Sequence, residues 1–250
     1  MKSARFRLIA CEILTHEIQT ILDSLPESPK MDVEFLPKGL HDVAAQERRA
    51  ALADSICRAD ESGRYDAILL GYGLCSRGIV GLSTRKTPLV VPRVHDCIAL
   101  LFGGCQPYED YFFAHPGTYF QTVGWLELGD DLSLLPPDSI QAQCGAGDSL
   151  EAFCEKYGPE NGPYLWRELG RMTRNYSRLA FLKTNRQTDE KCEKLAQNRA
   201  SQEGWTFDVR QGNLTLLTEL LSGKWNGSRF LVLPPGRILR ESFNADLICD

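Results

Sequence analysis

The chain has 250 residues, of which 43% are hydrophobic and 24% charged, a composition typical of a globular protein and not of a disordered one. The formal net charge of -5 at pH 7 and the lack of a dense lysine and arginine stripe argue against nucleic-acid binding. The apolar N-terminal stretch is interrupted by Glu12 and His16, so we expect neither a signal peptide nor a membrane span, and a cytoplasmic location.

Strands and helices alternate along the N-terminal part of the chain. Short apolar runs predict strands at 6–10, 33–36, 65–70 and 89–91, and apolar residues at helical spacing predict helices at 14–25, 43–59 and 98–102. In the second helix Leu52 and Ile56 share the apolar face. Arg48, Arg49 and Asp54 fall on the face available to water.

The same alternation returns near the C-terminus. A further strand is expected within 117–128, and the segment 136–162 is rich in proline, glycine and aspartate. Strands are then predicted at 178–183, 205–209 and 230–233, with helices at 189–202 and 214–221. The pattern predicts an α/β protein with a mostly parallel sheet or sheets, helices on both faces and a Rossmann-like arrangement, with the option of two similar halves around a cleft.

Three parts of the chain follow from this pattern. Residues 1–130 form an N-terminal α/β half that carries the functional site, 131–165 a linker or excursion, and 166–250 a C-terminal α/β half. The halves show no internal sequence repeat.

Cysteine and histidine side chains follow each predicted strand of the N-terminal half. Because the carboxyl ends of parallel strands lie at one edge of a sheet, these groups should gather there. Thiolates and imidazoles are the ligands that zinc and iron–sulfur clusters prefer. The sequence therefore predicts a metal site, with zinc or an iron–sulfur cluster as cofactor, whose ligands are Cys11, His41, Cys75, His95 and Cys97.

Two of these cysteines open predicted helices. Cys11 and Cys97 lie at helix starts, where unpaired N–H groups should lower a thiol pKa, and Asp96 is the expected N-cap of the second helix. Arg93 adds positive charge nearby. We therefore assign His95, Arg93 and His41 as the candidate catalytic residues.

The chain contains 9 cysteines and no Cys-x-x-Cys pair, which disfavours a local zinc ribbon. A free cysteine often packs as a small hydrophobic residue, so a merely structural role is the alternative for every member of the set. Cys105 is open between a fourth ligand and a position behind the site. The cysteines expected to be structural are Cys57, Cys144, Cys154, Cys192 and Cys249.

Several short motifs resemble the family catalogued as domain of unknown function 1638. The most specific are Tyr72-Gly73-Leu74-Cys75 and His95-Asp96-Cys97, and the resemblance is strongest from Cys11 to Glu127. Ser76-Arg77 departs from the pattern, where a glycine is expected after the cysteine. The resemblance lends no established activity. It implies occurrence beside corrinoid-dependent methyltransferase systems in bacteria and archaea, and hence one-carbon metabolism with a corrinoid protein as a partner.

Three functional hypotheses follow. The leading one is a metalloenzyme acting on a small-molecule substrate, in which zinc would activate a thiol for methyl transfer or a cluster would offer an open iron. The second is a metal or cofactor carrier, or an accessory protein of a corrinoid system. The third is a metal-free cysteine enzyme that uses Cys75 and Cys97 in acid–base or nucleophilic catalysis. The identity of the metal, the reaction and the oligomeric state stay open.

Overall fold

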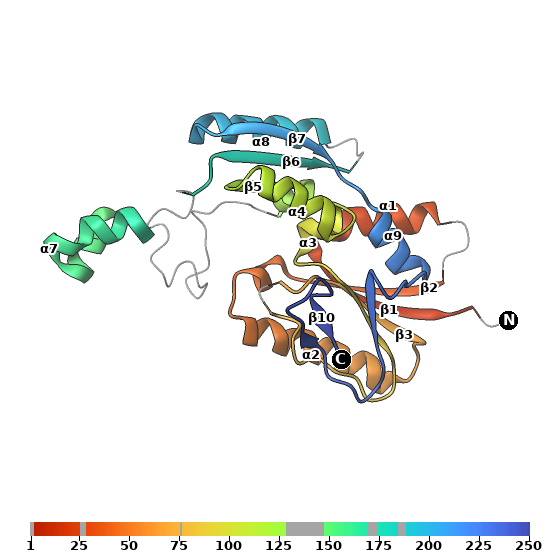
Figure 1. The fold of residues 1–250 in the computed structure, drawn as a ribbon. Helices are drawn as coiled ribbons and strands as arrows, with labels where there is room; N and C mark the ends of the chain where they lie inside the picture. Colours follow the sequence, from red (N-terminus) through yellow and green to blue (C-terminus); the bar gives the residue numbers. More distant parts are fainter. Residues whose placement is uncertain (1–2, 26–28, 76, 129–147, 170–174, 185–188) are drawn as a thin grey trace.

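The computed structural model describes residues 3–25, 29–75, 77–128, 148–169, 175–184 and 189–250, and it contains two main sheets (Figure 1). A five-stranded sheet has the order β2-β1-β3-β4-β8, and a three-stranded sheet has the order β5-β6-β7. All pairs are parallel except the β4–β8 pair and the small β9–β10 ribbon. The strands are β1 (Arg5–Cys11), β2 (Lys30–Leu36), β3 (Ala67–Gly71), β4 (Leu89–Pro92), β5 (Thr118–Gln121), β6 (Arg178–Lys183), β7 (Thr206–Gln211), β8 (Phe230–Leu233), β9 (Arg240–Glu241) and β10 (Ile248–Cys249).

Helices cover both faces of the five-stranded sheet, which confirms the predicted α/β class. In Figure 1, α2 lies on one face and α1 and α9 on the other, while α8 covers the outer face of the three-stranded sheet. The helices and short 3-10 turns are η1 (Glu12–Leu14), α1 (Thr15–Ser24), η2 (Lys38–His41), α2 (Ala45–Ser62), α3 (Cys97–Leu101), α4 (Cys105–Ala114), α5 (Val123–Glu127), α7 (Leu150–Leu169), α8 (Asp189–Glu203) and α9 (Thr215–Ser222). Within the described residues, none of the helices combines the length and apolarity needed to cross a membrane.

The interior strands of the larger sheet are apolar on both faces. Every residue of β3 (AILLG) and β4 (LVVP) is buried, as is typical of parallel strands covered by helices on both sides. The edge strand β2 (KMDVEFL) alternates polar and apolar residues and none of them is fully buried. The sequence pattern thus sets which strands lie in the centre.

Strand pairing crosses the middle of the chain. β5, which precedes the 131–165 segment, pairs with β6, and β8, near the C-terminus, pairs with β4 in the larger sheet. Each main sheet therefore takes strands from both sides of that segment. The division into 1–130, 131–165 and 166–250 stays a prediction.

Three segments differ from what the sequence pattern suggested. The strand expected within 117–128 stops at Gln121, because Thr122 caps α5 by accepting a hydrogen bond from the Trp125 N–H at 3.4 Å. The residues that begin at Cys105, for which the sequence pattern predicted no element, form the helix α4. The segment Leu150–Leu169 is helical, with a kink at Gly158, whose φ is 85°; α7 stands apart from both sheets in Figure 1.

Candidate metal centre

The carboxyl ends of β1 and β3 meet where the chain reverses its order across the five-stranded sheet. β1 lies between β2 and β3, so the connections after β1 and β2 run to opposite sides. Ala10 pairs with Gly71, and a Cβ atom on Gly71 would lie only 2.6 Å from the Cβ of Ala10. Cys11 and Tyr72 follow this pair directly. Ligands of open α/β sheets bind at such switch points, which makes this edge the first place to look for a site.

The loop after β3 runs beside the loop after β4. The Leu74 N–H donates to the Val94 carbonyl at 2.9 Å, and the Cys75 N–H donates to the His95 carbonyl at 2.8 Å. Gly73 permits this close approach, because a Cβ atom there would lie 2.6 Å from the backbone nitrogen of Asp96. Residues from two different strand ends are thereby held together.

Asp96 forms the N-terminus of α3, as predicted. Its side chain accepts hydrogen bonds from the Ile98 N–H at 2.9 Å and the Ala99 N–H at 3.0 Å. This cap fixes Cys97 as the first residue of the helix, with its side chain buried. The cap therefore positions both neighbours of Asp96, His95 and Cys97.

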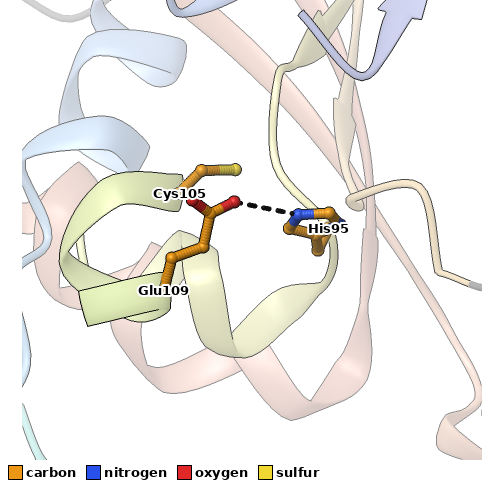
Figure 2. Close-up of side chains that lie close together, drawn as sticks. All are labelled: His95, Cys105 and Glu109. Atoms are coloured by element: carbon orange, nitrogen blue, oxygen red, sulfur yellow. Dashed lines mark hydrogen bonds and ion pairs between the residues drawn. The ribbon is translucent and has the colours of Figure 1, made fainter. Parts of the chain in front are cut away.

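His95, Cys105 and Glu109 form a group that could hold a metal ion. One ligand atom from each of the three lies within 4.8 Å of the others. Figure 2 shows the three side chains pointing toward one another, with the His95 Nε2 atom 3.2 Å from Oε1 of Glu109. Among the residues that the structure describes, this is the set of three potential ligands that meets that distance.

Two sequence features place Cys105 and Glu109 in this group. Gly103 and Gly104 have φ values of 82° and 144°, which end α3 and allow the chain to turn into α4. Cys105 and Glu109 are four residues apart on α4, so they share one helical face. The Cys105 thiol also donates to the Arg93 carbonyl at 3.3 Å, which fixes it beside the β4 loop.

A cavity of about 650 Å³ opens next to His95. Four of the residues predicted from sequence contribute to its wall: His41, Cys75, His95 and Cys97. The rest of the wall consists of Asp42, Val43, Ala45, Arg48, Leu74, Arg77, Asp96 and Glu241. The structure thus gathers side chains from the ends of β2, β3 and β4 around one space.

His41 and Arg93 differ in their positions. His41 is half-exposed at the cavity, 3.2 Å from the Asp42 carboxylate, and its ring meets the edge of Trp125 at 5.1 Å. Arg93 points to the C-terminal segment instead, where it donates to the carbonyls of Gly227 and Asp246, each at 3.0 Å. Arg93 therefore holds the C-terminal segment in place by hydrogen bonds and is absent from the cavity wall.

Burial governs the thiols of the predicted site. It raises the pKa of Cys11 to about 11 and of Cys75 to about 12, and it raises the pKa of Cys97 well above its ordinary value. Burial also raises the pKa of the Cys105 thiol to about 11. The expectation that helix starts would lower these pKa values is wrong for the protein without a cation, because desolvation outweighs the helix N-terminus.

Arg48 was expected to face water and does not. Only 4% of its surface is exposed, because its guanidinium donates to backbone carbonyls, including Leu40 at 2.6 Å and His41 at 2.6 Å, and also to the Cys75 carbonyl. Its hydrogen bonds therefore hold the loops after β2 and β3 against each other at the cavity.

The sequence pattern did not point to Glu109 and left the role of Cys105 open. A helix predicted over residues 105–114 would have revealed the pair, because a Cys-x-x-x-Glu spacing puts both side chains on one helical face. Among the cysteines expected to be structural, Cys57, Cys154 and Cys192 lie in helices and Cys249 in β10, and Cys144 lies outside the described residues.

Comparisons with known proteins give one match. The family model described as "Protein of unknown function (DUF1638)" matches residues 35–221, which is more than half of the chain. No curated protein and no solved structure matches this sequence.

Proposed function

Because the chain belongs to the DUF1638 family, whose description assigns no reaction, we propose a function from the site itself. The protein is a metalloenzyme that holds a divalent metal ion at His95, Cys105 and Glu109 and binds a small-molecule substrate in the adjoining cavity. The observation that carries this proposal is the convergence of one nitrogen, one sulfur and one oxygen ligand within 4.8 Å.

Zinc fits this ligand set best. It accepts sulfur, imidazole nitrogen and carboxylate oxygen at about 2.0–2.3 Å, and catalytic zinc sites combine three protein ligands with one open position. Three ligands around one tetrahedral ion lie roughly 4 Å apart, so small rotamer adjustments are enough to close the observed group. A softer metal would favour more sulfur, and magnesium or calcium would favour oxygen alone.

The cavity offers space for a substrate beside the metal ion. His95 belongs both to the ligand group and to the cavity wall, so a molecule in the cavity would lie next to the ion. A bound zinc ion supplies a Lewis acid and keeps a coordinated thiol or water deprotonated at neutral pH. His41, which is half-exposed and lines the same cavity, is the candidate for moving a proton to or from the substrate.

The finer proposal is methyl or thiol transfer in one-carbon metabolism, with a corrinoid protein as partner. It is supported by the association that the family resemblance implies and by the ability of zinc to activate a thiol. Metal-free cysteine catalysis is disfavoured, since burial raises the pKa values of Cys75 and Cys97 and a nucleophilic thiol needs the reverse.

A metal carrier is the second candidate function. The side chains of His95 and Glu109 are 41% and 35% exposed, and an accessible ligand set can release its metal to a partner. Release of zinc to a chelator separates the two functions, because a catalytic ion is retained through turnover and a carried ion exchanges readily.

The test is zinc analysis of the protein purified without oxygen, beside the variants His95→Gln, Cys105→Ser and Glu109→Gln. We expect close to one zinc per chain and a loss of affinity of at least about 10-fold in each variant. Asp110→Asn is the matched control on the same helix, where Asp110 accepts a hydrogen bond only from Gln106 among the bonds described for it. Equal zinc content in all four variants and the wild type would refute the proposal.

A further inference from the structure

A second set of soft ligands lies beside the proposed zinc site and takes no part in it. Cys11, Cys75 and Cys97 come from the ends of β1, β3 and β4, and Cys11 and Cys97 are each only 8% exposed. We propose that these three cysteines bind an iron–sulfur cluster, separate from the ion at His95, Cys105 and Glu109. The inference goes beyond the proposed function, because it concerns another site and another cofactor.

The backbone brings the three cysteines together. Cys11 follows Ala10, which pairs with Gly71 of β3, and the Cys75 N–H donates to the carbonyl of His95, two residues before Cys97. Cys75 and Cys97 also share the wall of the cavity. Each of the three sulfur atoms is close enough to the other two for electrostatic interaction.

Their spacing fits a group larger than one ion. Three sulfurs around a single tetrahedral metal at about 2.3 Å lie roughly 4 Å apart. In the described part of the chain, the group of three ligand atoms within 4.8 Å is that of His95, Cys105 and Glu109, so Cys11, Cys75 and Cys97 are spread more widely. An all-sulfur set with this spread suits a cluster, whose irons take one thiolate each.

Tyr72 supplies a buried hydroxyl group to this space. The residue is 5% exposed, and its hydroxyl group lies beside the Cys11 thiol, with no nitrogen or oxygen atom as a hydrogen-bond partner among the described residues. Electrostatic interactions connect it with all three cysteines. Cluster and thiolate sulfurs accept hydrogen bonds, and such bonds tune the reduction potential of a cluster. The Tyr72 hydroxyl is therefore placed to donate to the Cys11 sulfur or to a sulfur of the cluster.

Arg48 supplies the matching charge. Its guanidinium is buried and bonded to backbone carbonyls, and no ion pair with a carboxylate is found for it among the described residues. It interacts electrostatically with Cys11 and Cys75. An oxidised four-iron cluster with three thiolates carries roughly one net negative charge. Arg48 offsets that charge, which otherwise would be costly to bury.

The experiment uses the full chain, purified and reconstituted with iron and sulfide without oxygen. Iron, acid-labile sulfide, visible absorption and the electron paramagnetic resonance of the reduced protein are measured. We expect about four iron and four sulfide per chain in the wild type. We expect most of both to be lost in Cys11→Ser, Cys75→Ser and Cys97→Ser.

Two controls separate this result from the zinc proposal and from unfolding. Cys105→Ser should keep the cluster and lose zinc, and Cys192→Ser, which alters a buried cysteine of α8, should keep both. Tyr72→Phe should keep the cluster and shift its reduction potential, a readout that loss of folding does not produce. Circular dichroism confirms that each variant is folded.

Three outcomes overturn the proposal. The first is a wild type that takes up no sulfide. The second is zinc alone, held by Cys11, Cys75 and Cys97. The third is equal cluster content in the three serine variants and in Cys192→Ser.

Discussion

The Cys75 N–H donates to the carbonyl of His95 at 2.8 Å, which joins the loops after β3 and β4 backbone to backbone. One residue belongs to the proposed cluster site and the other to the proposed zinc site. A change that separates the two loops should therefore disturb both sites at once, whereas a change of one side chain should disturb only one.

Gly73→Ala should separate the loops. The new Cβ atom would lie 2.6 Å from the Asp96 nitrogen, so the backbone has to shift, and we expect a loss of about 1–3 kcal/mol in the free energy of unfolding. Zinc affinity should fall about 10-fold or more, because His95 moves with the loop. Urea unfolding and zinc titration measure the two effects. Gly227→Ala is the control, since nothing lies within 4 Å of a Cβ there; equal behaviour of both variants would contradict the argument.

Arg48→Met should destabilise the protein strongly, although the helical pattern predicted Arg48 to face water. It removes the donors to the carbonyls of Leu40, His41 and Cys75 and leaves buried acceptors unpaired. We expect a loss of about 2–5 kcal/mol, measured by urea unfolding. Arg49→Met, one residue further along α2 at an exposed position, should change stability by about 0.5 kcal/mol or less. A similar small effect of both would mean that the Arg48 side chain is not a structural link.

Asp60 should make the protein sensitive to acid. Burial alone would raise its pKa, but hydrogen bonds from the backbone N–H groups of Arg85, at 2.7 Å, and Thr87, at 2.8 Å, lower the pKa below the ordinary 3.8. Because the folded pKa is depressed, the contribution is complete above the unfolded pKa of about 3.9 and is lost as the pH falls through the folded value.

Replacement of Asp60 by asparagine tests this sign. Asp60→Asn should lower the free energy of unfolding by roughly 1–3 kcal/mol at neutral pH and flatten its decline below about pH 4. Urea unfolding across the acid range measures both changes. Asp54→Asn, with a 69% exposed side chain on the same helix, should follow the wild-type profile. A wild-type acid profile in Asp60→Asn would show that another carboxylate is responsible.

The buried thiols should label slowly in the metal-free protein. With a pKa of about 11, Cys11 holds about 100-fold less thiolate near pH 8 than a thiol of ordinary pKa 9.0, and burial raises the pKa of Cys97 in the same direction. Cys57 is exposed, so iodoacetamide should modify it well before Cys11 and Cys97, although its hydrogen bond to Glu61 raises its pKa too. Site-resolved mass spectrometry gives the order. Rapid labelling of Cys97 would instead favour metal-free cysteine catalysis.

Local sequence patterns predicted most elements of the fold. Apolar runs located β6 and β8 to the residue, because a buried parallel or edge strand needs a continuous or alternating apolar face. The strand-end rule also placed Cys75, His95 and Cys97 at one edge, where the cavity brings them together. These features depend on short stretches of sequence, so local patterns are enough to predict them.

What the sequence did not reveal depends on distant partners. Arg48 is buried by carbonyls of the β2 and β3 loops, which helical periodicity of α2 cannot show. Glu109 joins His95 through a turn at Gly103 and Gly104, which brings α4 beside the loop after β4, and local sequence patterns do not show that contact. Pairing of β8 with β4 is likewise a long-range choice that the apolar pattern leaves open.

The pairing of β8 with β4 has a consequence for the order of events during synthesis. β4 leads directly into His95 and Cys97, and its free edge is covered by Phe230–Leu233, while Arg93 is held by Gly227 and Asp246. A chain still emerging from the ribosome exposes β4 as an apolar edge until residues 227–246 have been synthesised. We therefore expect the edge that leads into the proposed metal ligands to be completed only after these residues have folded onto it, so that metal binding follows this step.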